Sequence, residues 1–273
     1  MMKKMFGLLI ALLLIISAAG GAFAEGKLDN ILAGGKIVMA TSPDFAPYEF
    51  MDPTKAGQEA IVGSDIELAK YIAEKLGVEL VIDTMDFAAV QAAVTQGRVD
   101  MAVSGFAYTE ERAEAMELSA FYNLDDESGQ GILVLKENAA NLAKAEDFAG
   151  KKVAAQNASL QYNLLTSQLP DAVAELITIV SDGVMLLLNG KVDAVAVSGK
   201  NGLGFVNNYN VLAMSDFYFD RYDEGNVIAV TKGEKDLINA INEIIQEVNE
   251  LGLYTQWMEE ATALAYSLGI NED

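Results

Sequence analysis

Residues 97–112 contain an arginine where the sequence pattern predicts an anion-binding loop. The apolar run from Val99 to Val103 predicts a buried strand, and Thr109 can cap a helix whose first turn contains Arg112. A strand end that leads into a helix start presents free backbone N–H groups and the positive end of the helix dipole. A guanidinium at the same place can hold a carboxylate through two hydrogen bonds. The pattern therefore favours Arg112 as the partner of a ligand carboxylate, and a surface ion pair with a neighbouring glutamate is the alternative.

The composition excludes several kinds of catalytic and metal site. The chain contains neither cysteine nor histidine. It can therefore form no disulfide, thiolate metal site or imidazole metal site, and it cannot use Ser-His-Asp or Cys-His catalysis. An enzyme would have to use carboxylates, lysine, tyrosine or serine, and we identify no catalytic pair with suitable spacing. We predict no catalytic residue, no metal and no cofactor.

The first 24 residues have the pattern of a secretory signal peptide. Two lysines precede the apolar core Phe6–Ile16, which is too short to span a membrane as a helix, and Ala22-Phe23-Ala24 is a typical cleavage sequence. We predict cleavage after Ala24 and a mature chain that starts at Glu25 in the periplasm, with an uncleaved anchor as the alternative. The absence of cysteine excludes a lipid-modified N-terminal cysteine.

The net charge limits the classes of partner. The formal charge is −22 at pH 7, and it becomes about −24 when the two lysines of the signal peptide are removed. Such a chain should be repelled by nucleic acids and by anionic lipid surfaces. We expect a monomer that binds neither.

Predicted strands and helices alternate along the chain, which indicates an α/β fold with mainly parallel sheets flanked by helices. In the first half, strands are expected at 36–41, 78–82 and 99–103, and helices at 64–76 and 87–95. In the second half, strands are expected at 131–135, 153–155, 176–180 and 192–197, and helices at 159–165 and 181–188. Two amphipathic helices, 235–251 and 254–268, end the chain. The expected caps are a capping box of Ser64 and Glu67, then Asn157 or Ser159, and Ser181.

A weak internal repeat indicates two similar lobes. Residues 97–105 resemble residues 190–199 with one residue inserted, and each segment follows an apolar helix. Polar segments at 123–131 and 222–225 are suitable crossovers between two units. We predict a two-lobed architecture with two hinge strands and a cleft between the lobes. Lobe 1 comprises residues 25–125 and 227–273, and lobe 2 comprises residues 126–226.

Five landmarks in order resemble the periplasmic amino-acid-binding proteins of ABC transporters, the solute-binding proteins of family 3. They are residues 36–50, 63–70, 86–87, 109–112 and 252–257. The resemblance covers nearly the whole mature chain. It implies a type II periplasmic binding fold that closes on a small polar solute and delivers it to a membrane permease, without identifying the solute.

The resemblance also implies a ligand site. It places a ligand carboxylate on Arg112, with the backbone N–H of Ala107 and the helix start near Ser159 as further donors. Phe45 and Phe87 match positions whose rings stack on the ligand, and core packing is the alternative for each. Two further aromatic residues of the opening loop are expected in the core, namely Tyr48 and Phe50.

The partner of a ligand ammonium is the open question. The family commonly has a hydroxyl residue where this chain has Ala107, and an aspartate where it has Ser198. Either Asp44 replaces that aspartate, or an acid of the crossovers does so, or the ligand has no α-ammonium. The carbonyl of Gly105 can accept one hydrogen bond, and Gln156 either contacts the ligand or lies in a solvated turn. The acids of the crossovers are Asp125, Asp126 and Glu224.

We predict a transport binding protein for a small carboxylate-bearing solute, preferably a polar or aliphatic amino acid. An enzyme on the same fold, related to dehydratases, is the alternative, and a soluble sensor for a membrane receptor is a third reading. A preference for lysine or arginine would instead indicate recognition of a cationic side chain by Phe45, Phe87 and an acidic cleft.

Overall fold

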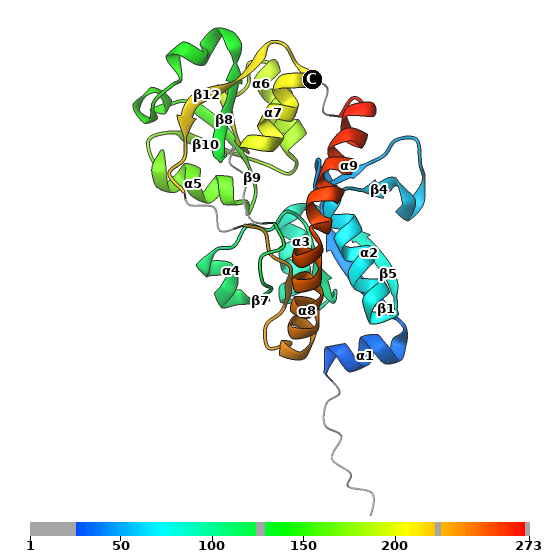
Figure 1. The fold of residues 1–273 in the computed structure, drawn as a ribbon. Coiled ribbons are helices and arrows are strands. Elements are labelled where there is room, and N and C mark those ends of the chain that lie inside the picture. The colour runs from blue at the N-terminus through cyan, green and yellow to red at the C-terminus, as the bar shows by residue number, and fades with distance from the viewer. Residues whose placement is uncertain (1–25, 124–128, 222–224, 271–273) are drawn as a thin grey trace, which may run out of the picture.

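The computed structural model describes residues 26–123, 129–221 and 225–270, which form two units, each built on a five-stranded sheet flanked by helices (Figure 1). The first sheet, with the order β5-β1-β6-β13-β7, defines the first unit, and the second sheet, with the order β10-β9-β11-β8-β12, defines the second unit. The strands of the first sheet are β1 Lys36–Thr41, β5 Glu79–Thr84, β6 Met101–Ala102, β7 Met116–Leu118 and β13 Ala229–Thr231. Those of the second are β8 Gln130–Leu135, β9 Lys152–Gln156, β10 Val173–Ile177, β11 Ala194–Ser198 and β12 Leu212–Tyr218. A third, small sheet contains β2 Asp44–Phe45, β3 Glu49–Met51 and β4 Ile61–Val62.

Helices cover both faces of each large sheet. Successive strand residues point to opposite faces, and apolar residues on both faces pack against helices. In β1, Ile37 and Met39 pack in one cluster with α2 and α8, whereas Val38 and Ala40 pack in another with α3. The helices of the first unit are α1 Lys27–Gly34, α2 Ser64–Leu76, α3 Phe87–Thr95, α4 Glu110–Ala115, α8 Lys235–Leu251 and α9 Leu253–Ser267. Those of the second are α5 Leu160–Gln168, α6 Val180–Leu188 and α7 Gly199–Asn208.

Both large sheets are mixed. In the first, β1 pairs in parallel with β5 and β6, while β13 pairs antiparallel with β6 and β7. In the second, β9 pairs in parallel with β10 and β11, while β8 pairs antiparallel with β11 and β12. The antiparallel pairs arise at β8 and β13, the first strands formed after the chain passes from one sheet to the other. The predicted α/β class is confirmed, and the antiparallel strands are an addition that the helix–strand alternation did not indicate.

The internal repeat has a structural counterpart. The Oδ2 atom of Asp100 accepts a hydrogen bond from the N–H of Val38 at 2.8 Å, and the Oδ2 atom of Asp193 accepts one from the N–H of Lys152, also at 2.8 Å. Asp100 directly precedes β6 and accepts a hydrogen bond from β1, and Asp193 directly precedes β11 and accepts one from β9. Asp193 therefore has a structural role in the second sheet.

The predicted capping box at the start of α2 is wrong. Gly63 occupies the N-cap position without a side-chain cap, and its positive φ of 133° brings its Cα so close to Tyr48 that a Cβ would lie 2.1 Å from the carbonyl oxygen. The hydroxyl of Ser64 lies 3.0 Å from that of Tyr254 on α9. Asp65 is fully buried. The start of α2 is therefore fixed by tertiary contacts, which override the local pattern.

A second local prediction is also wrong. Strand β10 ends at Ile177 and α6 begins at Val180, so that Ser181 lies inside the helix instead of capping it. The N-cap residue is Ile179, which has no side chain capable of capping. The other predicted caps, Thr109 and Ser159, do accept hydrogen bonds from helix N–H groups.

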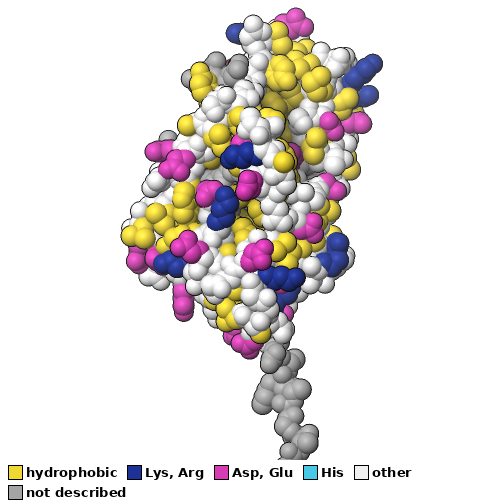
Figure 2. Space-filling model, turned by 90° about the vertical axis from the view of Figure 1, so that its right-hand side faces the viewer, with side chains coloured by type: hydrophobic (Ala, Val, Ile, Leu, Met, Phe, Trp, Pro, Cys, Tyr) yellow, Lys and Arg dark blue, Asp and Glu magenta, His cyan; other side chains and the backbone are white. Residues whose placement is uncertain are grey.

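Three further observations concern membrane-spanning helices, the segments outside the described residues, and the surface charges. Within the described ranges, no helix combines the length and apolar character needed to cross a membrane. The predicted signal peptide and most of both crossovers lie outside these ranges. On the face shown in Figure 2, acidic side chains are interspersed with lysine and arginine.

Candidate functional site

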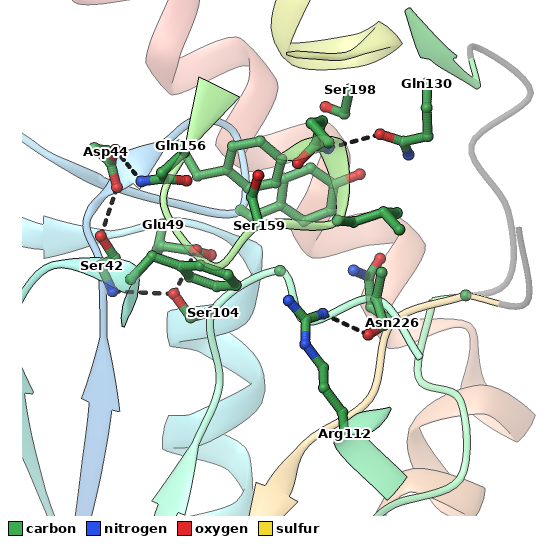
Figure 3. Close-up of a pocket in the computed structure, with 18 residues that line it drawn as sticks. Ser42, Asp44, Glu49, Ser104, Arg112, Gln130, Gln156, Ser159, Ser198 and Asn226 are labelled. Atoms are coloured by element: carbon green, nitrogen blue, oxygen red, sulfur yellow. Dashed lines mark hydrogen bonds between the residues drawn. The ribbon is translucent and has the colours of Figure 1, made fainter. Parts of the chain in front are cut away.

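A pocket lies between the two units and is lined by loops from both (Figure 3). It contains all nine residues that the sequence singled out, so the structure brings together segments that are more than 150 positions apart. The predicted residues are Asp44, Phe45, Phe87, Gly105, Ala107, Arg112, Gln156, Ser159 and Ser198. The pocket also contains residues that the sequence analysis did not single out for it, namely Ser42, Tyr48, Glu49, Ser104, Gln130, Leu160, Gln161, Gly225 and Asn226.

Arg112 is buried, in contrast to the surface ion pair considered as its alternative. Its Nη1 donates to the carbonyl of Ala107 at 2.6 Å, and its Nη2 donates to that of Ala158 at 3.2 Å. The guanidinium carbon lies 5.4 and 5.1 Å from the ring centroids of Phe87 and Phe106. Burial lowers the pKa of Arg112 to about 10, with a smaller contribution from Arg221, so the side chain stays protonated at neutral pH. No carboxylate of the described residues forms an ion pair with it, which leaves its charge available for an anion.

Asp44 is engaged by groups of both units. Its carboxylate accepts hydrogen bonds from Ser42 Oγ at 2.7 Å, Gln156 Nε2 at 3.1 Å and the N–H of Val180 at 3.4 Å. Val180 begins α6, so Asp44 supplies an acceptor to a helix start that lacks its own cap. Burial raises the pKa of Asp44, and its hydrogen bonds oppose the shift. Gln156 also donates to the carbonyl of Thr178 at 3.0 Å.

Glu49 is a buried acid that the sequence analysis missed. Its Oε1 accepts a hydrogen bond from Ser104 Oγ at 2.9 Å, while its Oε2 has no hydrogen-bond partner among the described residues. Burial, reinforced by the charge of Asp65, raises the pKa of Glu49 well above its ordinary value. The available signal was an acidic residue between two aromatic residues, Tyr48 and Phe50, that were both expected to point inward. Because an unpaired buried carboxylate is unfavourable, Glu49 is a candidate partner for a cation that enters the pocket.

Asp65, on α2, fixes the loop that contains Gly105. It accepts hydrogen bonds from the N–H of Gly105 at 2.8 Å, from Tyr122 Oη at 2.9 Å and from Tyr254 Oη at 2.6 Å. Gly105 has a φ of 54°, and a Cβ there would lie 2.8 Å from the ring of Phe45. The loop is therefore fixed to α2 and α9 at the point where it meets the aromatic wall.

The aromatic wall consists of two pairs. The Phe45 ring stacks on the Tyr48 ring with a centroid distance of 5.0 Å and an interplanar angle of 13°. Phe87 packs on Phe106 at 5.1 Å. Tyr48 was expected in the core and is buried, yet it also lines the pocket, whereas Phe50 lies in the core as expected. Flat rings of this kind suit an aliphatic chain or a delocalised cation.

The wall contributed by the second unit is polar and uncharged. The hydroxyl of Ser159 caps α5 by accepting from the N–H of Tyr162 at 3.1 Å. The hydroxyl of Ser198 likewise accepts from the N–H of Asn201 at 3.3 Å, and the side chain of Gln161 donates to that of Gln130 at 2.6 Å. In the described part of the pocket, no acid lies on this wall. The crossover acids considered for the ammonium lie outside the described residues: Asp125, Asp126 and Glu224.

The charges of the pocket are separated. Figure 3 shows Ser42, Asp44 and Glu49 grouped together and Arg112 apart from them. Asp44 and Ser198 both line the pocket, the first from the first unit and the second from the second unit. In the described ranges, no cluster of acidic residues could hold a metal ion. The arrangement suits an elongated molecule with a carboxylate at one end and a cation at the other.

Comparisons with known proteins agree with the fold. Residues 37–261 match the sequence model of the bacterial extracellular solute-binding proteins, family 3. The chain is 34% identical to the amino acid ABC transporter substrate-binding protein AbpA from Streptococcus pneumoniae, solved with bound L-arginine; the match covers 89% of this chain and 100% of that one, with a TM-score of 0.80. It is 25% identical to the L-cystine-binding protein TcyJ of Escherichia coli (strain K12), over 89% of each chain. It is also 26% identical to the ancestral amino acid-binding protein AncCDT-1, a precursor of cyclohexadienyl dehydratase, over 85% of this chain and 98% of that one, with a TM-score of 0.75.

Proposed function

Because the chain belongs to the bacterial extracellular solute-binding proteins of family 3, we propose that it captures an amino acid with a cationic side chain, arginine in the first place. The observation that carries this proposal is the separation of Arg112 from the unpartnered carboxyl oxygen of Glu49 within one pocket. The sequence favoured a polar or aliphatic amino acid, because Glu49 was overlooked. The arginine bound to the similar protein of Streptococcus pneumoniae supports the revised choice.

The proposed pose follows the charges of the pocket. The α-carboxylate binds Arg112, the N–H of Ala107 and the start of α5 at Ser159, where helix N–H groups favour an anion. The aliphatic chain lies against the Phe45 ring. The guanidinium of the ligand forms an ion pair with the carboxylate of Glu49 through its unpartnered oxygen. Neither charge is then buried without a partner. The α-ammonium is held by neutral acceptors, including the carbonyl of Gly105.

The two units act as lobes that close on the ligand. We place the first lobe at residues 25–125 and 227–273 and the second at residues 126–226, with two crossover strands as the hinge. The strand content of the two sheets supports this division. The location outside the cytoplasm follows from the family, and we propose that the mature monomer begins at Glu25, resides in a periplasm and delivers its ligand to an ABC permease. We also propose that the protein does not bind nucleic acid, because of its negative charge.

The chain acts as a binding protein and not as an enzyme. The likeness to a precursor of a dehydratase makes catalysis the second candidate. Two of the buried acids at or behind the pocket have other partners, however: Asp65 accepts hydrogen bonds from Gly105 and two tyrosines, and Asp44 accepts one from a helix start. A carboxyl that is bonded in this way is not positioned to transfer a proton to a substrate. The third, Glu49, is the proposed partner of the ligand cation.

Isothermal titration calorimetry with matched ligands tests the proposal. L-citrulline is the neutral counterpart of L-arginine, so we expect arginine to bind at least about 30-fold more tightly, because only arginine pairs with Glu49. The des-amino analogue of arginine lacks the α-ammonium. It should bind with most of the affinity of arginine, because the described residues of the wall near Ser198 carry no charge that pairs with that ammonium. Mass spectrometry of solutes that co-purify with the folded protein gives an independent identification. Equal affinity for arginine and citrulline, or binding of no amino acid, would refute the proposed ligand.

A further inference from the structure

One carbonyl group of the second unit accepts hydrogen bonds from two side chains of the first. The oxygen of Ala158 lies 2.9 Å from Gln91 Nε2 and 3.2 Å from Arg112 Nη2. Gln91 lies on α3 and does not line the pocket. This contact between protein groups therefore crosses the cleft beside the ligand site.

The accepting residue has an unusual backbone. Ala158 has a φ of 60°, and within the described ranges it is the one non-glycine residue with a positive φ. A residue with a side chain is unfavourable in this left-handed conformation, so the conformation persists where the surroundings hold it. The two donors provide that hold, because they fix the direction of the Ala158 carbonyl.

The position of Ala158 gives the contact a consequence for the ligand site. The next residue, Ser159, is the N-cap of α5, whose start faces the pocket. Arg112, the second donor, is the proposed partner of the ligand carboxylate. The carbonyl thus connects the two elements that would bind the same carboxylate from opposite sides.

We infer that Gln91 is a positioning residue for the ligand site, which holds the Ala158 carbonyl across the cleft and thereby favours the closed arrangement of Arg112 and α5. This inference rests on the proposed two-lobed binding function. Gln91 touches no ligand in this role. The Gln91 amide provides a second hydrogen bond to the Ala158 carbonyl, in addition to that from Arg112. Part of the contact between the closed lobes is therefore formed without the ligand.

Distance measurements by pulsed electron resonance test the inference without any ligand. The chain has no cysteine, so spin labels can be attached selectively after the substitutions Glu110→Cys on α4 and Asn163→Cys on α5, both exposed positions. In this background Gln91→Glu keeps the shape of the side chain but places a carboxylate against the carbonyl, and Gln91→Ala removes the donor. Gln96→Ala is the matched control, because Gln96 follows α3, is exposed and contacts Arg98 of its own unit.

We expect both Gln91 variants to shift the label distances to longer values than in the parent and the Gln96→Ala control. Stopped-flow binding of L-arginine should show a dissociation rate raised about 2- to 10-fold by Gln91→Ala, the range that one neutral hydrogen bond supplies, with little change in the association rate. Distance distributions that are the same in all four proteins would overturn the inference. Failure of the parent protein to bind L-arginine would refute the proposed ligand instead, and the distances would still decide the role of Gln91.

Discussion

Replacing Glu49 with glutamine removes one charge from the pocket and leaves its shape nearly unchanged. The amide oxygen can still accept the hydrogen bond from Ser104 Oγ, which spans 2.9 Å in the native protein. What is lost is the pairing of Oε2 with a ligand cation. Two unit charges 4 Å apart attract by about 4 kcal/mol at an effective dielectric constant of 20, and loss of one partner of a buried charge pair costs about 2–5 kcal/mol. We expect Glu49→Gln to weaken arginine binding by about 2–4 kcal/mol, roughly 30- to 1,000-fold.

Citrulline provides the internal control for this substitution. It has no charge to lose, so its dissociation constant should change far less than that of arginine. Because burial raises the pKa of Glu49, a bound cation should release its proton, and calorimetry in buffers of different ionisation enthalpy would detect that release in the native protein and not in the variant. If Glu49→Gln weakens arginine and citrulline equally, or weakens neither, the reasoning is refuted and the cation binds elsewhere.

The same substitution makes a prediction for stability. An acid whose pKa is higher in the folded state than in the unfolded state binds more protons when folded, so its contribution to the unfolding free energy falls as the pH rises above the unfolded pKa. For Glu49 this window begins near the ordinary value of 4.5. Glu49→Gln should therefore raise the unfolding free energy of the unliganded protein more at pH 7 than at pH 4. Urea denaturation at the two pH values measures the difference, and an equal effect at both would contradict the buried, protonated state.

Four further predictions concern other positions. Arg112→Ala should cost about 2–5 kcal/mol in arginine binding if the carboxylate pair is desolvated, and Arg112→Lys should also weaken binding because it loses the planar fork; an unchanged dissociation constant in variants shown by circular dichroism to be folded would place the carboxylate elsewhere. Asp44→Asn should weaken arginine and citrulline by similar factors in calorimetry, because Asp44 bonds α6 and Gln156, whereas a selective loss for arginine would assign it to the ligand cation. Ala158→Gly should raise the unfolding free energy by up to about 1 kcal/mol, and with it the urea midpoint, because glycine adopts a positive φ without strain. A lower midpoint would show that the backbone is not strained there. N-terminal sequencing of the exported protein should begin at Glu25, and a retained Met1 would overturn the predicted cleavage.

Much of the site was predictable because its residues follow strand ends. Arg112, Thr109 and Gly105 lie where an apolar run stops and a capped helix begins, a pattern that can be read locally. Ser159 followed from the same logic. The position of these loops relative to each other came from the α/β alternation, which brings strand ends of one sheet to the same edge.

The misses have a common physical cause, which is that tertiary contacts decided them. Glu49 and Asp65 carry charges that are usually exposed, and only the packing of α2, α9 and the pocket loop shows that they are buried. Ser64 and Glu67 fit the capping pattern, yet a close approach of Gly63 to Tyr48 fixes that helix start. The antiparallel placement of β8 and β13 depends on how the chain re-enters each sheet, and neighbouring residues do not encode it.

Strand β13 has a consequence for the order in which the molecule can assemble. It lies between β6 and β7 in the first sheet, and β7 is attached to that sheet only through it. A growing chain that does not yet include residues 229–231 therefore has two unjoined pieces of the first sheet, β5-β1-β6 and β7 alone. Pairings over such sequence separations are slow to form. The sheet of the first unit can therefore be completed only after the whole of the second unit, which precedes β13 in the chain, has been synthesised.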